Sequence, residues 1–275
     1  MAEPTISVLI CSIDPSKYER VTANYSRALA DHPHEIIGIH DARSLAEGYN
    51  RAVRKSRGDF LLFSHDDVEI ASGDLAPAIV RASKALDVIG VVGTSKVLSG
   101  YWPAAGHPFL HGWLAQPAPA VRPAEQRYYV GVFGVEGPLT AGVQGLDGMF
   151  FVARRAVVES VPFDEQTFDG FHGYDLDFSF TAHLAGFSVG TSADIAVIHA
   201  SGGSFGEAWQ LYANRFAEKH REHLPTEVFP AKWSFARMPV ESKDAIVRDF
   251  PLERLMAITR QLRAAATGSP PPSRA

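Results

Sequence analysis

Runs of apolar residues alternate with amphipathic stretches through the first hundred residues of the chain. Four short apolar runs are typical of buried strands. They span residues 5–12, 34–41, 59–64 and 88–97. The stretches between them repeat apolar positions every three or four residues, which predicts helices. These helices span residues 16–32, 44–58 and 74–86. The alternation of strands and helices predicts an α/β fold whose central sheet is mostly parallel and covered by helices on both faces.

The second predicted helix carries its own end signals. Ser44 stands at the N-cap position, Glu47 three residues later completes a capping box, and Gly58 marks the C-terminal stop. The segment is therefore expected to form a helix from residue 44 to residue 58.

The pattern changes between about residues 99 and 145, where glycine, proline and aromatic residues dominate. Proline-rich spacing prevents long helices, so we expect a loop excursion with a short hairpin around residues 127–133. Regular patterns return after it and end in a strand at 193–201 and a helix at about 206–223.

Three parts of the chain are expected to differ in structure. Residues 1–224 are predicted to form one large domain that includes the excursion, and residues 225–266 a helical extension with amphipathic stretches. That extension could pack on the core, bind a partner, self-associate or rest at a membrane surface, with core packing or self-association favoured. Residues 267–275 are low in complexity and predicted to be disordered.

Composition narrows the class of protein. The chain has 275 residues, of which 46% are hydrophobic, so it can bury a large core. Its formal charge of -5 argues against a general nucleic-acid binder. A single cysteine, Cys11, excludes an internal disulfide and suits a reducing compartment. The first twenty residues have no basic region and only a short apolar run, so we expect no signal peptide or transmembrane segment and a cytoplasmic protein.

Three polar residues, His65, Asp66 and Asp67, directly follow the third predicted strand. Adjacent carboxylates repel each other unless a cation, hydrogen-bond donors or water compensate them. Ligands gather at the carboxyl ends of parallel strands, and these residue types suit a divalent ion such as Mg²⁺ or Mn²⁺. In an extended segment His65 and Asp67 point the same way and Asp66 points elsewhere. A metal site and a simple turn or helix cap are both open interpretations.

Two further polar groups lie downstream. Asp175 and Asp177 stand where a glycine-rich loop enters a helix, so one is expected to cap the helix and the other is free to act as a general base. His199 ends a predicted strand, and Gly202 and Gly203 behind it leave room for a ligand or a mobile lid. A lone histidine at a strand end is, however, more often structural.

Five segments in a fixed order carry a resemblance to a known family. They are SVLICS, EIIGIHD, AEGYNRAVRKSRGDFLLFSHDDVEI, GLDGMFFVARR and GYDLDFSFTAHLAGFSVG. In this order they resemble glycosyltransferase family 2 with the GT-A fold, which has a Rossmann-like central sheet. More narrowly, the chain resembles bacterial family-2-like enzymes in which HDDV replaces the usual acidic cluster. The resemblance covers about residues 5–224.

The resemblance implies a site for a nucleotide diphosphate sugar, which would be a UDP-, dTDP- or GDP-sugar. In the family, residues after the first two strands, in the helix before the third strand, in the DxD motif and beside the donor sugar form this site. The matching residues are Ser12, Asp14, Asp41, Tyr49, Asn50, Asp66, Asp147 and Gly148.

The resemblance also implies a metal site and a base. The DxD motif of the family falls on the HDD segment, where His65 replaces the first acid and Asp67 is the foremost metal ligand. His199 stands where a late histidine completes the coordination in many such enzymes. The general base of the family corresponds to Asp175, and Tyr174 occupies the position of the preceding glutamate.

Together these assignments imply an inverting glycosyltransferase of glycan or polysaccharide biosynthesis that depends on Mn²⁺ or Mg²⁺. The cation would stabilise the departing diphosphate, and Asp175 would remove the proton of the acceptor hydroxyl. The acceptor would be a saccharide or a lipid-linked molecule, with the protein in the cytoplasm or peripheral at the inner membrane face. Aromatic residues of the excursion could form a stacking platform for the acceptor or pack on the core. They are Tyr101, Trp102, Trp113, Tyr128 and Tyr129.

Two other classes stay open. A nucleotidyltransferase also uses an α/β sheet and a metal, but usually has a glycine-rich basic phosphate loop, which the segment CSIDPSKYER lacks. A non-catalytic domain that binds carbohydrate or a partner would keep the fold while the HDD segment departs from the acidic motif.

Overall fold

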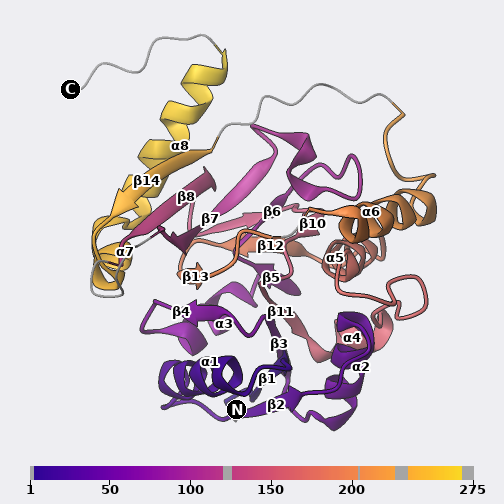
Figure 1. Ribbon diagram of the computed structural model, residues 1–275. Helices are drawn as coiled ribbons and strands as arrows, with labels where there is room; N and C mark the ends of the chain where they lie inside the picture. Colours follow the sequence, from indigo (N-terminus) through magenta and orange to yellow (C-terminus); the bar gives the residue numbers. More distant parts are fainter. Residues whose placement is uncertain (1–2, 120–125, 204, 227–234, 268–275) are drawn as a thin grey trace.

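The computed structural model describes residues 3–119, 126–203, 205–226 and 235–267. Two seven-stranded sheets organise this part of the chain (Figure 1). The strands of the first sheet are, in spatial order, β2 (His34–Ile39), β1 (Ile6–Cys11), β3 (Phe60–Ser64), β11 (Phe150–Arg154), β5 (Val88–Gly90), β12 (Val189–Ser192) and β9 (Leu139–Ala141). The strands of the second sheet are β10 (Gly145–Leu146), β6 (Val92–Thr94), β7 (Leu110–Pro117), β13 (Val197–His199) and β4 (Val68–Ile70), with β8 (Tyr128–Gly134) and β14 (Ala236–Val240) extending from β7.

The first three helices follow the predicted order, whereas the 3₁₀ turn and the fourth α-helix were not predicted. The helices are α1 (Pro15–Ala28), α2 (Leu45–Lys55), α3 (Leu75–Ala82), η1 (a 3₁₀ turn, Trp102–Ala105), α4 (Arg155–Ser160), α5 (Tyr174–Leu184), α6 (Glu207–Lys219), α7 (Lys243–Asp249) and α8 (Leu252–Thr267). Helices α1 and α2 lie on opposite sides of the strands β1 to β3 (Figure 1). The Ser44 side chain caps α2 as expected, but the helix ends at Lys55, earlier than the predicted stop at Gly58.

The first sheet is mixed, not mostly parallel as the sequence predicts, because three of its six strand pairings are parallel and the other three, including β12 with β9, are antiparallel. Strand β1 pairs in parallel with both β2 and β3, and β12 pairs in parallel with β5. Strand β11 runs antiparallel to both β3 and β5 and separates them, which the sequence did not predict. The α/β fold with helices on both faces is confirmed. The insertion of β11 has a consequence for function, because it places the residues that precede β11 beside the end of β3.

The predicted strand over 88–97 is divided between the two sheets. Its first part forms β5 and its second part forms β6, and Val91 lies at the junction. Gly112 of β7 faces that junction with a φ of 93°, and a Cβ atom there would overlap the carbonyl oxygen of Val91. The close crossing of β7 over the divided strand therefore requires glycine at this position.

Between residues 99 and 145, much of the described chain belongs to the second sheet, although β9 belongs to the first. The short hairpin predicted around residues 127–133 does not form there, because these residues lie almost entirely in one strand, β8, which pairs with β7 along much of its length. Alternate residues of β8 face the core, since Val130 and Val132 are fully buried. Residues 120–125, between the two strands, lie outside the described ranges.

The C-terminal extension packs on the second sheet. Strand β14, which the sequence did not predict, pairs with β8, and the predicted helices α7 and α8 follow it. Leu255 and Ile258 of α8 are buried in the apolar cluster under this sheet, and the Thr259 hydroxyl accepts a hydrogen bond of 2.7 Å from the Val135 amide. Core packing therefore occupies the apolar face of α8. Apart from Thr267, the predicted disordered tail lies outside the described residues.

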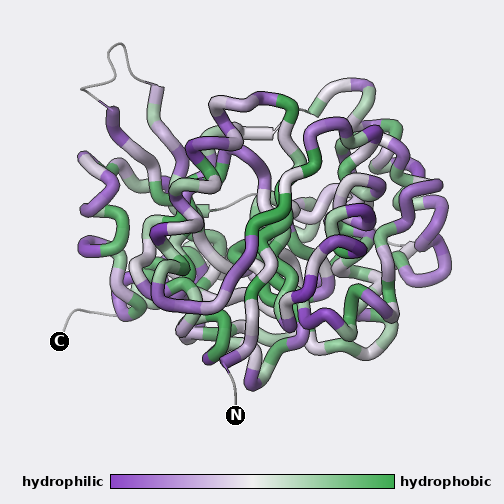
Figure 2. The backbone as a smooth tube through the Cα atoms, turned by 90° about the horizontal axis from the view of Figure 1, so that it is seen from below, coloured by the Kyte–Doolittle hydropathy of each residue, from purple (hydrophilic) through white to green (hydrophobic). Residues whose placement is uncertain are grey.

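Apolar strands run through the centre of the molecule and polar segments surround them (Figure 2). Two apolar clusters lie against the first sheet and a third lies between the second sheet and α8. Among the helices of the described ranges, none is both long and apolar enough to cross a membrane.

Candidate active site

Two strand pairings bring the HDD segment beside two distant parts of the chain. In the first, Phe150 of β11 lies opposite Ser64 of β3, and the His65 amide donates to the Met149 carbonyl at 3.0 Å. This pairing fixes the turn that precedes β11, with Asp147 and Gly148, next to His65.

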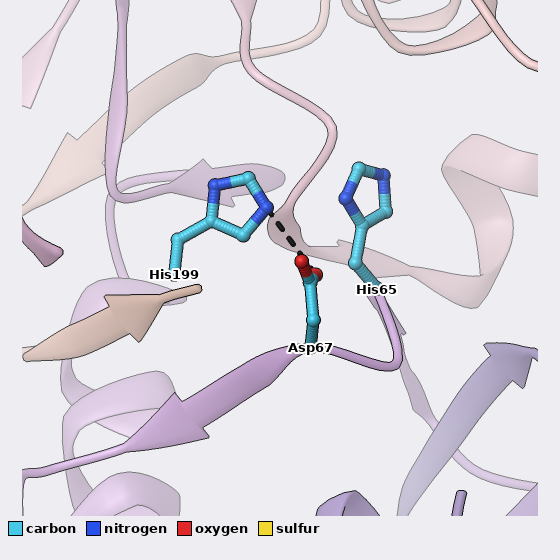
Figure 3. Close-up of side chains that lie close together, drawn as sticks. All are labelled: His65, Asp67 and His199. Atoms are coloured by element: carbon cyan, nitrogen blue, oxygen red, sulfur yellow. Dashed lines mark ion pairs between the residues drawn. The ribbon is translucent and has the colours of Figure 1, made fainter. Parts of the chain in front are cut away.

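The second pairing joins β4 and β13. His199 lies opposite Val68, and the Ala200 amide donates to the Asp67 carbonyl at 3.0 Å. The side chains of His65, Asp67 and His199 consequently converge, each with one ligand atom within 4.8 Å of the others (Figure 3). The Nε2 atom of His199 is 3.3 Å from a carboxylate oxygen of Asp67. We refer to His65, Asp67 and His199 as the triad.

The electrostatics of the triad leave it ready to bind a cation. Burial and the neighbouring charge of His199 lower the pKa of His65 to about 4, so its imidazole is neutral at pH 7. Burial opposes ionisation of Asp67, but the hydrogen bond from His199 and the charges of both histidines outweigh it and hold the pKa of Asp67 well below its usual range. Neutral imidazoles and an ionised carboxylate are the forms that ligate divalent metals, so the triad fits such an ion.

Asp66 points away from the triad, as its position between His65 and Asp67 predicts. Its carboxylate accepts a hydrogen bond of 2.7 Å from the Ser12 hydroxyl and lies 3.8 Å from the Lys17 ammonium group. Ser12 and Asp66, two of the predicted donor-binding residues, therefore lie together at the carboxyl edge of β1 and β3.

A cavity of about 480 Å³ opens beside the triad. His65 and His199 contribute to its wall, together with Asp147 and Asp175. Aromatic side chains cover much of the rest. They include Tyr101, Trp102, Phe133, Phe205 and Trp209. The cavity thus joins a cluster of titratable groups to an aromatic surface.

Asp147 and Asp175 form the acidic side of this cavity. Asp147 accepts hydrogen bonds of 3.0 Å from the Trp102 indole and from the Met149 amide. Asp175, in the first turn of α5, gains no comparable support from a cation. Its burial, followed by the nearby charge of Asp147, raises the pKa of Asp175 to about 7. This carboxyl therefore exchanges a proton near neutral pH.

Gly148 makes this close approach possible. A Cβ atom at position 148 would lie 2.6 Å from the Asp175 Cβ and 2.8 Å from its Cγ, and would overlap the Tyr174 hydroxyl. Any larger residue would push α5 away from the turn that precedes β11. The sequence predicted Gly148 as a donor-binding residue, and the structure gives it a steric reason as well.

Asp177 lies on another side of α5 and does not line the cavity. It is 2% exposed and accepts hydrogen bonds from the His220 imidazole at 2.7 Å and from the Lys219 ammonium group at 2.8 Å. Both partners come from α6 and the residue after it, so Asp177 anchors α6 to α5.

The other predicted donor-binding residues divide into two groups. Asp14 caps α1 by accepting from the Ser16 and Lys17 amides, and Asp41 lies at the exposed end of β2 in an ion pair of 2.6 Å with Arg51. Both remain at the edge of the sheet that holds Ser12.

Tyr49 and Asn50 are not brought to that edge as free groups. The Tyr49 side chain is fully buried and its hydroxyl donates to the Ser64 carbonyl at 3.1 Å. Asn50 binds both the carbonyl and the amide of Phe163. In this structure both residues fix α2 to its surroundings.

The aromatic residues of the excursion also fall into two groups, those that line the cavity and those that pack elsewhere. Tyr101 and Trp102 line the cavity, whereas Trp113 is 3% exposed and donates its indole N–H to the Ala193 carbonyl. Phe205 and Trp209 were not predicted, yet both contact the Tyr101 ring edge-on, with centroids 5.7 and 5.5 Å away. Their signal in the sequence is two large aromatic residues within six positions after the glycine pair that follows His199.

Sequence comparison identifies the class of protein that this fold and site define. A model of the Glycosyltransferase like family matches residues 7–220. The chain therefore belongs to this family. No curated protein matches the sequence.

Several solved structures are similar at low sequence identity. Mannosyltransferase PcManGT from Pyrobaculum calidifontis, in complex with GDP-Man and Mn²⁺, has 14% identity and a TM-score of 0.49 over 98% of this chain and 78% of that one. S. aureus TarS 1–349 has 13% identity and a TM-score of 0.45 over 80% and 73%. GalNAc-T7 with UDP, GalNAc and Mn²⁺ has 13% identity and a TM-score of 0.46 over 78% of this chain. This chain spans about half, 48%, of the GalNAc-T7 chain.

Proposed function

We propose that the protein is an inverting, metal-dependent glycosyltransferase that moves a sugar from a nucleotide diphosphate sugar to an acceptor hydroxyl. The observation that carries this proposal is the placement of two chemical functions at one cavity. The triad can hold a divalent ion, and Asp175 can accept a proton near pH 7. Transfer of a sugar from a diphosphate requires both functions.

The triad is the proposed metal site, with Mn²⁺ or Mg²⁺ as the ion. A divalent cation held there would offset the negative charge that develops on the departing diphosphate. His65 and Asp67 lie between β3 and β4, and His199 ends β13; the two histidines line the cavity in which the donor would bind. The neutral state of His65 and the ionised state of Asp67 are the forms of these two side chains that ligate a divalent ion.

Asp175 is the proposed general base. A base is most effective when its pKa lies near the working pH, and the pKa of Asp175 is raised to about 7. In its ionised form it would take the proton of the acceptor hydroxyl while that oxygen attacks the anomeric carbon. One displacement with the base on the acceptor side and the diphosphate on the metal side inverts the configuration of that carbon.

The donor and acceptor are proposed to occupy different parts of the site. The edge formed by Ser12, Asp14, Asp41 and Asp66 would hold the nucleotide of a UDP-, dTDP- or GDP-sugar. The aromatic wall of the cavity would receive the acceptor, a saccharide or a lipid-linked molecule, because aromatic rings offer flat apolar faces to sugar rings. Trp102 would hold the Asp147 carboxylate between the two parts through its hydrogen bond.

Nucleotide binding with and without metal tests the proposal. Thermal unfolding would be followed with UDP, dTDP and GDP, each with and without Mn²⁺. We expect at least one nucleotide to raise the melting temperature only when Mn²⁺ is present, since ligands that bind the folded state stabilise it. The shift should disappear in Asp67→Ala and persist in Asp74→Ala, which removes an exposed carboxylate paired with Arg81. The proposal fails if no nucleotide diphosphate stabilises the protein in either condition.

A further inference from the structure

A buried hydroxyl supports the back of the triad. The Tyr174 hydroxyl lies 2.9 Å from Nε2 of His65 and donates to the Gly148 carbonyl at 3.2 Å. The Tyr174 side chain is almost fully buried, at 3% exposure, and a tyrosine hydroxyl carries its proton at neutral pH. This hydroxyl thus connects one triad residue to the turn that precedes β11.

Counting hydrogens along this contact determines the tautomer of His65. A hydroxyl has one hydrogen, and the Gly148 carbonyl can only accept, so the Tyr174 hydrogen points at Gly148. The Tyr174 oxygen must then accept from His65, which requires the hydrogen of the neutral imidazole on Nε2. The other nitrogen, Nδ1, is left with a free lone pair.

The free nitrogen is the one that faces the other triad residues. In Figure 3 one ring nitrogen of His65 is directed toward the space that it shares with Asp67 and His199, and the other is directed away from it. Since Nε2 contacts Tyr174, the inward nitrogen is Nδ1. His199 presents Nε2 to the same space, 3.3 Å from Asp67.

We propose that Tyr174 is a positioning residue that makes Nδ1 of His65 a metal ligand, and that the resulting site of two imidazole nitrogens and one carboxylate selects transition-metal ions such as Mn²⁺ and Co²⁺ over Mg²⁺. This inference rests on the proposed metal site. It goes beyond that site by choosing between the two ions that the sequence left open. Mg²⁺ strongly favours oxygen ligands, whereas imidazole nitrogen suits transition metals.

The fixed surroundings of Tyr174 explain why it can act in this way. Its ring packs against the rings of Tyr49 and Phe163, with centroids 5.6 and 6.2 Å away. Its acceptor, the Gly148 carbonyl, belongs to the turn that the pairing of β11 with β3 holds in place. A hydrogen-bond partner behind a ligating histidine fixes both the ring orientation and the tautomer. Its loss typically weakens metal binding roughly 10- to 100-fold.

The first test removes the hydroxyl and measures metal binding directly. Isothermal titration of Tyr174→Phe with Mn²⁺, in the absence and in the presence of UDP or GDP, should show a dissociation constant roughly 10- to 100-fold above that of the wild type. Tyr25→Phe is the matched control, because the Tyr25 hydroxyl is equally buried and binds the Ser64 side chain one residue before His65 without touching the His65 ring. Tyr25→Phe should bind Mn²⁺ as the wild type does. An unchanged affinity in Tyr174→Phe overturns the inference.

The second test counts the nitrogen ligands. Pulsed electron paramagnetic resonance of bound Mn²⁺ should show couplings to two imidazole nitrogens in the wild type and to one in His65→Asn. The wild type should also bind Mn²⁺ and Co²⁺ more tightly than Mg²⁺, and His65→Asp should reduce that preference, because only the His199 nitrogen remains. A single nitrogen coupling in the wild type, or equal affinity for Mg²⁺, contradicts the inference.

These outcomes are separable from failure of the proposed function. Two nitrogen couplings together with weakened binding in Tyr174→Phe support the inference even if no nucleotide sugar is consumed, in which case only the proposed transfer reaction fails. Conversely, an active transferase whose Mn²⁺ shows one nitrogen coupling retains the proposed function and refutes the role of Tyr174. Absence of Mn²⁺ binding by the wild type, with and without nucleotide, overturns the inference.

Discussion

Two carboxylates on α5, only two residues apart, experience opposite surroundings. Asp177 faces α6, where the Lys219 ammonium group and the His220 imidazole both bind it at less than 3 Å. Asp175 faces the cavity, where its burial and then the charge of a second carboxylate, Asp147, raise its pKa to about 7. Asp177 is bound by an ammonium group and an imidazole, whereas the hydrogen bonds to Asp175 come from backbone amides.

The difference separates stability from reactivity. A buried carboxylate with hydrogen-bonding cations holds elements together, and removing it leaves the cations without a partner. Burial and a neighbouring acid destabilise the ionised form of a carboxylate, so that the group readily accepts a proton. Function should depend on the Asp175 side of α5 and folding on the Asp177 side.

The largest effect is expected for a substitution of Asp175, on the cavity side of α5. Asp175→Asn should lower the rate of sugar transfer by about a hundred- to ten-thousand-fold, since the amide cannot accept the proton of the acceptor. Binding of the nucleotide diphosphate with Mn²⁺ should stay close to that of the wild type. Steady-state kinetics and calorimetry on the same preparation separate the two quantities. Equal transfer rates in the variant and the wild type would remove Asp175 from the mechanism.

The next largest effect is expected for a substitution of Asp177, on the side of α5 that faces α6. Asp177→Ala should lower the free energy of unfolding by about 3–5 kcal/mol, because it leaves the buried His220 imidazole facing a gap and leaves Lys219 with its other carboxylate partner, Asp164. Denaturant unfolding measures the change, with Asp74→Ala as a control in which an exposed ion pair is lost. At a temperature where the variant is folded, its transfer rate should be near that of the wild type. A variant of normal stability and low activity would reverse the assignment of the two acids.

The transfer rate and the stability of the protein should both depend on pH through Asp175. Because Asp175 must be ionised to act, the transfer rate should fall about tenfold per pH unit below pH 7 and level off above it. Stability should show the opposite trend. The pKa of Asp175 is higher in the folded chain, about 7, than the usual carboxyl value of 3.8, so its favourable contribution is complete below about pH 4 and is lost as the pH rises through 7.

Asp175→Asn provides the check on this pH trend. The variant should lack the part of the decline in unfolding free energy between pH 4 and pH 7 that comes from this carboxyl, whereas Asp74→Ala should retain it. A wild-type rate that is level between pH 5 and pH 8 would argue against a base of this pKa.

The smallest expected effect concerns one of the two partners of Asp177. Lys219→Gln should cost about 1 kcal/mol of stability, because the His220 hydrogen bond to Asp177 remains and Lys219 is partly exposed to solvent. Thermal unfolding at fixed pH resolves such a change. A loss as large as that in Asp177→Ala would mean that Lys219 alone carries the contact between α5 and α6.

Much of the fold was predictable, because local patterns determine it. The strands β1, β2 and β3 and the helices α1 and α2 follow from unbroken apolar runs and capping residues, and they lie within a few residues of their expected ranges. The place of β11 between β3 and β5 was not predictable, since it depends on pairing between segments about ninety residues apart in sequence. The division of the strand around Val91 likewise depends on a distant partner, Gly112.

The site was predictable in its residue types and less so in its contacts. The resemblance named every member of the triad, and the strand pairings place them together. It also named Tyr49, which the apolar face of α2 instead buries against Phe63. The contact between Tyr174 and His65 joins the two positions at which this chain departs from the family pattern. No single segment of the sequence reveals that these two residues meet.

A crystal structure with a nucleotide diphosphate sugar and Mn²⁺ tests the central claim most directly. We expect Mn²⁺ ligated by His65, Asp67 and His199, a diphosphate oxygen on the ion, and the sugar in the aromatic cavity with its anomeric carbon accessible from the Asp175 side. Mn²⁺ bound away from these three residues, or a sugar bound outside the cavity, would contradict it.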